Sequence, residues 1–404
     1  MIFSSRFGFL ISLAVSSSNS AFAQNLLISS KNNKIDIVSD SVGFKRLFKR
    51  LDTLVRFGVG QVNIVHIGGS HVQADIYSNR IRERLRTYFP GFEGPRGFVF
   101  PYTVARTNNP SNYKVEYGGQ WKVCKNVNAM DCSLGIAGIN VSTGDSSAWI
   151  RIIPSKNENT IYSYNKIRLY YERDTQTTTC MVSPRELVDK VRFNENPTFI
   201  EYKFKRPCDT IQFQIKSQIN RAFSFTLHGI QFLSDEPGVI YHSLGVNGAA
   251  TSSFLRCALF VDHLRELKPD LIIFSLGVND AHGPSFSKDN FKRNYERLMV
   301  WVKEAAPLAA VLFVTNNDTY IRRRYINENH PVVKECMYEI AEKFNGAVWN
   351  LYDLMGARGS MMHWHNAGLA QSDLIHFTTA GYHHIGDRLF EAFIKLWADF
   401  NRVP

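Results

Sequence analysis

The feature that most constrains the fold is an alternation of apolar strands and amphipathic helices in two separated parts of the chain. Residues 44–51 have a helical pattern, and an apolar strand at 62–67 and a second helix at 76–88 follow. After Pro237 the alternation resumes. Strands are expected at 271–275, 310–314 and 347–350, and helices at 291–306, 332–344 and 381–400. Because strands that alternate with helices form parallel sheets covered on both faces, we predict an α/β fold.

The stretch between these two parts has a different texture. Short alternating or β-branched runs occur at 148–153, 166–171, 199–204 and 223–227, and turn residues separate them. This pattern is typical of a β-sandwich. We therefore predict an α/β domain formed by residues 24–111 and 236–404, with an all-β sandwich inserted at 112–235.

The N-terminus has the pattern of an export signal. Arg6 precedes an apolar run at 7–15, and small residues ending in Ala21-Phe-Ala23 follow. Serines interrupt the run well before the roughly 20 apolar residues that a membrane anchor requires. We predict a signal peptide at 1–23, a mature chain that begins near Gln24, and a periplasmic or secreted product with no membrane span.

The net charge limits the class of partner that the chain can bind. The formal net charge is +11, and removal of Arg6 with the leader leaves +10. A positive chain attracts acidic polymers, but export argues against nucleic acid. An anionic glycan, such as a cell wall with peptide and lactyl carboxylates, fits both facts, although a role in solubility alone explains the charge equally well.

The cysteine pattern predicts neither a metal site nor a disulfide scaffold. Six cysteines are spread over the chain without a C-x-x-C pair. Cys124 and Cys132 are the best local candidates for a disulfide. Cys257 lies in an apolar helical stretch, where we expect it to pack as a small hydrophobic residue.

The first chemical motif is Ile67-Gly-Gly-Ser-His-Val-Gln-Ala-Asp75. It lies where a predicted strand ends and a helix begins, which is the edge at which open α/β sheets bind ligands. At such a helix N-terminus, free N–H groups and the helix dipole could stabilise an oxyanion beside Ser70. The alternative is that Gly-Gly-Ser is an ordinary turn and helix cap.

Three further motifs follow in the sequence. Ser243-Leu-Gly-Val-Asn-Gly contains Gly248, which would let the backbone approach a ligand closely. Phe274-Ser-Leu-Gly-Val-Asn-Asp280 places Asn279 directly after an apolar strand. In Ser372-Asp-Leu-Ile-His376 the carboxylate of Asp373 and the imidazole of His376 stand three residues apart. On a helical turn both would project from one side, as a triad requires. Each motif also occurs as a common turn, cap or surface pair.

Taken in order, the four motifs resemble the blocks of the SGNH, or GDSL-type, hydrolase superfamily. The resemblance implies a flavodoxin-like three-layer domain and an esterase that needs neither metal nor organic cofactor. It implies that Ser70 is the nucleophile, with His376 as general base and Asp373 as the residue that orients it. The oxyanion hole would consist of Ser70, Gly248 and Asn279.

One residue departs from the superfamily pattern. The first block usually reads Gly-Asp-Ser, and here Gly69 replaces the Asp. In the superfamily this Asp braces the turn and takes no part in proton transfer. We therefore expect the replacement to affect the rigidity of the turn more than the mechanism.

The inserted β-domain gives a narrower resemblance, to peptidoglycan O-acetylesterases with an inserted domain like a carbohydrate-binding module. It implies an acetylated glycan as substrate, with cell-wall peptidoglycan first. Two alternatives stay open. One is an acetylesterase that acts on other polysaccharides or on small or lipid esters, with Tyr102, Trp121 and Trp149 either stacking on sugars or packing in the core. The other is a non-catalytic glycan-binding protein, which only Gly69 supports.

Two further groups of residues have no assigned role in the motifs. His71 follows the predicted nucleophile and either lines the pocket or caps a helix. The run Arg322-Arg-Arg324 is expected to form a solvated face.

Overall fold

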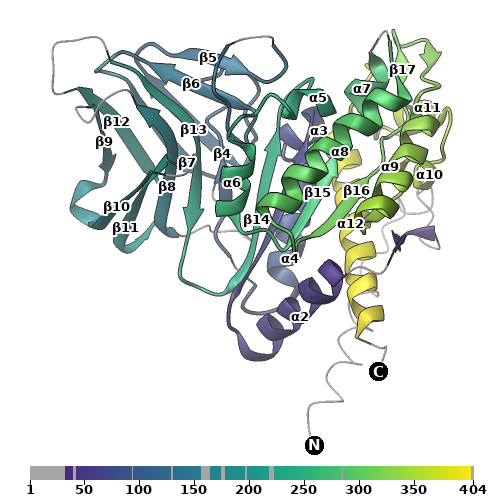
Figure 1. Cartoon of the computed structure of the whole chain (residues 1–404), viewed down its shortest axis with the longest axis horizontal. Coiled ribbons are helices and arrows are strands. Elements are labelled where there is room, and N and C mark those ends of the chain that lie inside the picture. The colour runs from purple at the N-terminus through teal and green to yellow at the C-terminus, as the bar shows by residue number, and fades with distance from the viewer. Residues whose placement is uncertain are drawn as a thin grey trace, which may run out of the picture.

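The computed structural model describes residues 32–39, 42–92, 94–128, 131–155, 164–173, 178–195, 198–217, 223–283 and 285–401. The predicted signal peptide at 1–23 lies outside these residues. Two bodies lie side by side, an α/β domain that contains both ends of the described chain and a β-rich domain (Figure 1). The architecture is the predicted one.

The α/β domain is built on a six-stranded sheet with the order β1-β19-β16-β15-β2-β14. The strands are β1 (Ile35–Ile37), β2 (Gln61–Gly68), β14 (Gly238–Gly245), β15 (Leu271–Ser275), β16 (Ala310–Val314) and β19 (Ala347–Trp349). All neighbours pair in parallel except β1, which is antiparallel to β19. If the five parallel strands are counted along the chain, their order is 2-1-3-4-5, which is the flavodoxin-like order.

Helices cover both faces of this sheet, as the alternation predicts (Figure 1). One face packs against α2 (Val42–Phe57), α4 (Tyr77–Tyr88) and α12 (Thr379–Phe400). The other packs against α6 (Phe260–Leu267), α8 (Lys288–Ala305) and α9 (His330–Phe344). In α2 the buried positions recur every three or four residues, so one apolar stripe faces the sheet.

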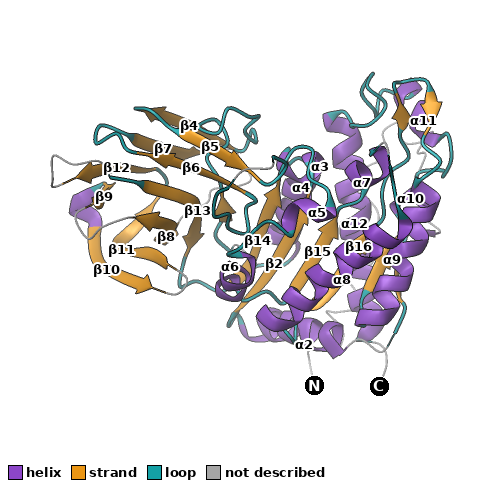
Figure 2. Cartoon of the chain, turned by 45° about the horizontal axis from the view of Figure 1, so that its top comes forward, coloured by secondary structure: helices purple, strands orange, loops and turns teal. Residues whose placement is uncertain are grey.

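The inserted domain consists of two antiparallel sheets (Figure 2). One has the order β10-β11-β8-β13-β6-β5, and the other has the order β4-β7-β12-β9. The strands are β4 (Tyr113–Gly118), β5 (Lys122–Lys125), β6 (Ile139–Thr143), β7 (Trp149–Pro154), β8 (Tyr164–Arg173), β9 (Thr178–Ser183), β10 (Val188–Glu195), β11 (Thr198–Cys208), β12 (Ile211–Ser217) and β13 (Phe225–Leu233). One further strand, β3 (Gly97–Val99), pairs with β13 although it lies in the range predicted for the α/β domain.

The two domains share a continuous apolar core and several polar contacts. The backbone N–H of Leu259 donates to the Leu134 carbonyl over 3.0 Å, and the Ile136 N–H reaches His263 Nδ1 over 3.4 Å. A buried ionic cluster joins the start of the β-domain to α4. In it, the carboxylate of Asp75 accepts hydrogen bonds from Arg82 and Asn112 and pairs with Arg96.

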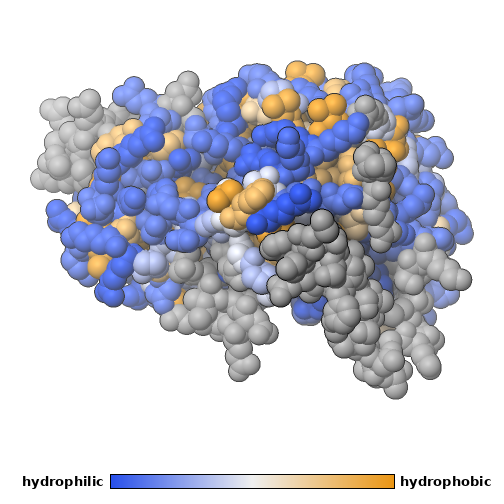
Figure 3. All heavy atoms as spheres, turned by 90° about the horizontal axis from the view of Figure 1, so that it is seen from below, coloured by the Kyte–Doolittle hydropathy of each residue, from blue (hydrophilic) through white to orange (hydrophobic). Residues whose placement is uncertain are grey.

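The remaining sequence expectations concern the cysteines and the membrane. Cys124 and Cys132 form a disulfide, and Cys257 is fully buried among apolar residues. Among the helices of the described residues, none combines the length and apolar character needed to cross a bilayer. Seen from below, the described surface is mostly hydrophilic with scattered apolar residues (Figure 3).

Candidate active site

Ser70 lies at the first position of α3 (Ser70–Gln73), immediately after β2. The strand order reverses between β2 and its neighbours β14 and β15, so this is the switch point where α/β sheets bind ligands. The turn needs a glycine before it. A Cβ on Gly68 would lie 2.2 Å from Val72 Cγ2. The close approach of strand and helix thus fixes where the serine side chain emerges.

The structure brings Ser70, His376 and Asp373 together. Ser70 Oγ lies 2.8 Å from His376 Nε2, and His376 Nδ1 lies 2.7 Å from Asp373 Oδ2. The imidazole and the carboxylate are each about 30% exposed. This connectivity, hydroxyl to imidazole to carboxylate, is that of an acyl-transfer triad.

The Asp373–His376 pair is held by a tight turn, whereas the sequence predicted a helical turn. Leu374 has a φ of +57°, a left-handed conformation that ends any helical path. The turn lets the N–H groups of Ile375 and His376 donate to Asp373 Oδ1 over 2.9 and 3.0 Å. Asn317, in the loop after β16, supports the same turn by donating to the Ile375 carbonyl over 3.0 Å.

These contacts keep the orienting carboxylate ionised. Burial opposes ionisation of Asp373, but the N–H donors of His376 and Ile375 and the imidazole itself hold its pKa below the usual value. An ionised carboxylate bonded to Nδ1 selects the tautomer in which Nε2 can accept the serine proton.

The loops that carry the predicted oxyanion residues border the turn before Ser70, because Val246 N–H donates to the Gly68 carbonyl and Asn279 lies beside Gly69. Gly248 is exposed and has a φ of +79°. Glycine adopts this left-handed conformation readily because it has no Cβ. The preceding residue is held in place because Asn247 N–H donates to the buried Gln73 Oε1 over 2.7 Å. Asn279, in α7 (Val278–His282), donates one amide hydrogen to the Ala249 carbonyl over 2.9 Å. That contact orients its Nδ2 at the same edge.

Gly69 is explained by the position of Asn279. A Cβ at residue 69 would lie 3.0 Å from Asn279 Nδ2 and 3.4 Å from the Ala249 carbonyl oxygen. Bracing of this edge comes from another carboxylate, since Asp280 accepts from the backbone N–H and the hydroxyl of Thr251. Asp280 therefore connects the Asn279 motif to the Gly248 motif without any carboxylate at residue 69.

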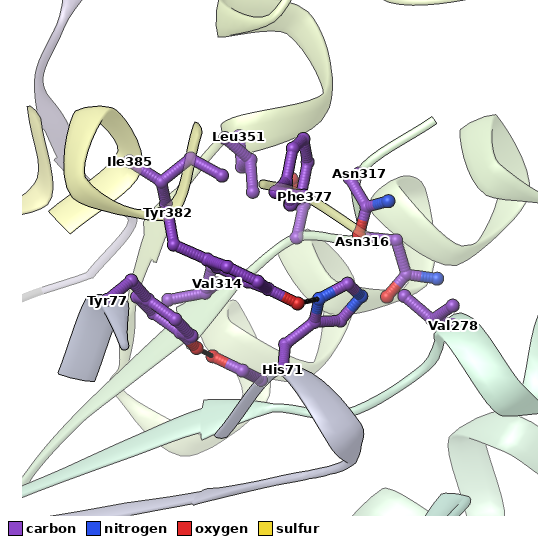
Figure 4. Close-up of a pocket in the computed structure, with 12 residues that line it drawn as sticks. His71, Tyr77, Val278, Val314, Asn316, Asn317, Leu351, Phe377, Tyr382 and Ile385 are labelled. Atoms are coloured by element: carbon purple, nitrogen blue, oxygen red, sulfur yellow. Dashed lines mark hydrogen bonds between the residues drawn. The ribbon is translucent and has the colours of Figure 1, made fainter. Parts of the chain in front are cut away.

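His71 lines a small cavity together with Tyr382, Phe377 and Asn316 (Figure 4). Its Nδ1 lies 2.7 Å from the Tyr382 hydroxyl, and its Nε2 is buried without a hydrogen-bond partner among the described residues. The ring centroid is 5.1 Å from that of His376. Burial lowers the pKa of His71 to about 3, and charge on His376 acts in the same direction. A neutral ring thus packs beside the predicted base.

Sequence reasoning missed Gln73, Asp280, Asn317 and Tyr382. Gln73 and Asp280 lie inside motifs that were already singled out, so their proximity to the named residues was the available signal. Nothing in the local sequence pointed to Tyr382 or Asn317, because their hydrogen-bond partners, His71 and Ile375, are distant in the sequence.

The aromatic residues that were considered for sugar stacking are mostly in the core. Tyr102 and Trp121 are buried, and the Tyr102 hydroxyl donates to the Gly245 carbonyl. Trp149 is half-buried. In the part of the chain that the structure describes, no three His, Cys, Asp or Glu side chains gather in a group that could hold a metal ion.

Comparisons with known proteins agree with this geometry. Residues 228–384 match the GDSL-like lipase/acylhydrolase family, a range that includes Gly248, Asn279, Asp373 and His376 but does not reach Ser70. Among curated proteins no sequence relative of this chain is found.

A solved structure shares the fold over most of the chain. A peptidoglycan O-acetylesterase aligns with a TM-score of 0.68 and 18% identity, over 92% of this chain and 99% of its own. An acetylxylan esterase from Geobacillus stearothermophilus (TM-score 0.31, 15% identity) covers 38% of this chain and 72% of its own. A lipase/acylhydrolase from Enterococcus faecalis (TM-score 0.30, 22% identity) covers 39% of this chain and 75% of its own. The family match over residues 228–384 and the shared fold agree with the SGNH-type hydrolase domain that the sequence predicted.

Proposed function

We propose that this chain is an exported serine esterase that removes O-acetyl groups from a carbohydrate, most specifically from cell-wall peptidoglycan. The observation that carries the catalytic part is the hydrogen-bonded path from Ser70 Oγ through His376 to Asp373. Every role that an acyl-transfer site needs has a residue at the same sheet edge.

The mechanism follows from the positions of these groups. Ser70 Oγ attacks the ester carbonyl while His376 Nε2 takes its proton, and Asp373 stabilises the imidazolium that forms. The negative charge on the carbonyl oxygen faces the N–H groups of Ser70 and Gly248 and the Asn279 amide. Collapse expels the sugar hydroxyl, which takes the proton from the imidazolium. Water activated by His376 then releases acetate from the acyl-serine.

A glycan substrate is supported by where the β-domain meets the site. Val127 lies in the segment between the paired Cys124 and Cys132, and a Cβ on Gly248 would approach its Cγ1 to 3.9 Å. The exposed Gly248 thus stands at a wall formed by the inserted domain. A solved structure that shares the fold over 92% of this chain is a peptidoglycan O-acetylesterase, which adds support for a wall glycan.

The experiment is an acetate-release panel on the purified mature chain. We expect acetate from O-acetylated peptidoglycan to exceed acetate from acetylxylan at equal ester concentration, and we expect none from peptidoglycan de-O-acetylated with mild base. Preference for acetylxylan or for a small ester such as p-nitrophenyl acetate would favour the second candidate, an acetylesterase of other substrates.

Export has its own test. The leader pattern at residues 1–23 supports cleavage, so the protein recovered from outside the cytoplasm should begin near Gln24. An intact N-terminal Met1 on that protein, or its recovery only from the cytoplasm, would overturn the export proposal without touching the esterase assignment.

A further inference from the structure

The unusual surface feature of the α/β domain is a short hairpin with three arginines at its tip. Strand β17 (Tyr320–Ile321) pairs with β18 (Tyr325–Ile326), and the turn between them is Arg322-Arg-Arg324. Arg322 and Arg323 have φ angles of +52° and +58°. Turns of this shape favour glycine or asparagine. The backbone is therefore strained at Arg322 and Arg323.

Within the described residues, the charges of this hairpin have no acidic partner. All three arginines are exposed, and none forms an ion pair with a residue in the described ranges. The Arg324 guanidinium lies over the Tyr325 ring at 5.4 Å. Arg358, by contrast, pairs with Glu328. The tip therefore concentrates positive charge beside exposed Ile321 and Tyr325 side chains.

The base of the hairpin is bonded to the active site. Tyr320 N–H donates to the carbonyl of Leu374, the residue that follows Asp373 in the catalytic turn, over 3.1 Å. On its other side, Asn327 Nδ2 donates to the Ala281 carbonyl in α7 over 3.2 Å. β17 lies at the same upper edge as α3 and α7 (Figure 1). Two extended residues reach about 7 Å, so the arginines stand roughly that far beyond the catalytic turn.

We propose that this hairpin binds the carboxylate groups of an acidic acetylated glycan while its ester lies at Ser70. The inference rests on the proposed function and names the chemistry of its substrate. Guanidinium groups bind carboxylates in a bidentate manner, and the exposed Tyr325 ring offers an apolar face to a sugar. An anionic lipid surface would also attract arginines, but the anchorage of the hairpin on the catalytic turn favours the substrate.

The test compares two triple variants that lose the same charge. One is Arg322→Gln, Arg323→Gln, Arg324→Gln. The control is Lys49→Gln, Arg56→Gln, Lys395→Gln, at exposed positions of α2 and α12 in the α/β domain, away from the hairpin (Figure 1). Both are made in the active chain and in a Ser70→Ala background, in which binding to peptidoglycan is measured by co-sedimentation without turnover.

We expect the hairpin variant to bind O-acetylated peptidoglycan about tenfold more weakly than the control, because three exposed ion pairs that each contribute about twofold together give roughly that factor. The ratio of kcat/KM on peptidoglycan to kcat/KM on p-nitrophenyl acetate should fall by the same factor, because the KM for peptidoglycan rises. Converting the glycan carboxyls to methylamides should remove the difference between the variants, and salt should weaken binding of the parent protein.

Equal binding by the two variants would overturn the proposal, as would an undiminished difference on the amidated glycan. Normal glycan binding with lost binding to phosphatidylglycerol vesicles would overturn it in favour of a lipid surface. A failure of the esterase assignment looks different, since then the chain with Ser70 intact would release no acetate from any ester.

Discussion

Placing a side chain at Gly69 should disturb the Asn279 amide. A Cβ there would lie 3.0 Å from Asn279 Nδ2, whereas non-bonded heavy atoms prefer about 3.5–4.0 Å. The φ at Gly69 is −90°, so no left-handed conformation reserves this position for glycine. Asn279 must move by about 0.5 Å, and since a misplacement of 1 Å can cost about 10²-fold, Gly69→Ala should lower kcat about tenfold with little change in KM.

Gly69→Asp, which restores the residue of the resembled block, should lower kcat further. It adds negative charge beside the developing oxyanion. The largest decrease in kcat that we expect is that caused by loss of one oxyanion donor, about 10²- to 10³-fold. Steady-state hydrolysis of p-nitrophenyl acetate measures both variants, with Asn279→Ala as the ceiling and thermal unfolding as the control for folding. A Gly69→Asp variant as active as the parent would refute this reasoning and show that a carboxylate at 69 braces the turn.

Three further predictions concern stability and positioning. Asp75→Asn leaves two buried arginines without their carboxylate, so urea unfolding should show a loss of about 3–5 kcal/mol; a loss below about 1 kcal/mol would contradict it. Burial lowers the pKa of His66 to about 3, so below about pH 6.5 only the unfolded chain takes up this proton. Stability should then fall by up to about 1.4 kcal/mol per pH unit, and His66→Gln should make the fall shallower between pH 6.5 and 5. Gln73→Ala releases Asn247 N–H and should lower kcat more than it raises KM; a change in KM alone would argue against a positioning role.

The α/β frame was predictable because its strands are apolar runs with clear ends. β15 and β16 have the bounds that the sequence predicted. The sequence does not predict β14 as a strand, because its residues at 238–245 include two glycines, a serine and a histidine. The pairing of β3 with β13 could not be predicted either, because it joins residues about 130 positions apart.

The site was predictable as a set of residues but not as a geometry. Chain order and motif type named Ser70 and His376, yet their contact spans 306 residues and only the fold creates it. The spacing of Asp373 and His376 indicated that they would meet, but a left-handed Leu374 gives no sequence signal. The bond between His71 and Tyr382 crosses the domain in the same way, and it arises from packing of α12 against α4.

The central claim is that Ser70 is a nucleophile activated by His376. A fluorophosphonate probe tests it directly, because it labels only a serine whose hydroxyl is activated. We expect one adduct on the mature chain, mapped to Ser70 by peptide mass spectrometry, and loss of both the adduct and p-nitrophenyl acetate hydrolysis in folded Ser70→Ala and His376→Ala proteins. Hydrolysis that persists in folded Ser70→Ala, or an adduct on another serine, would contradict the account.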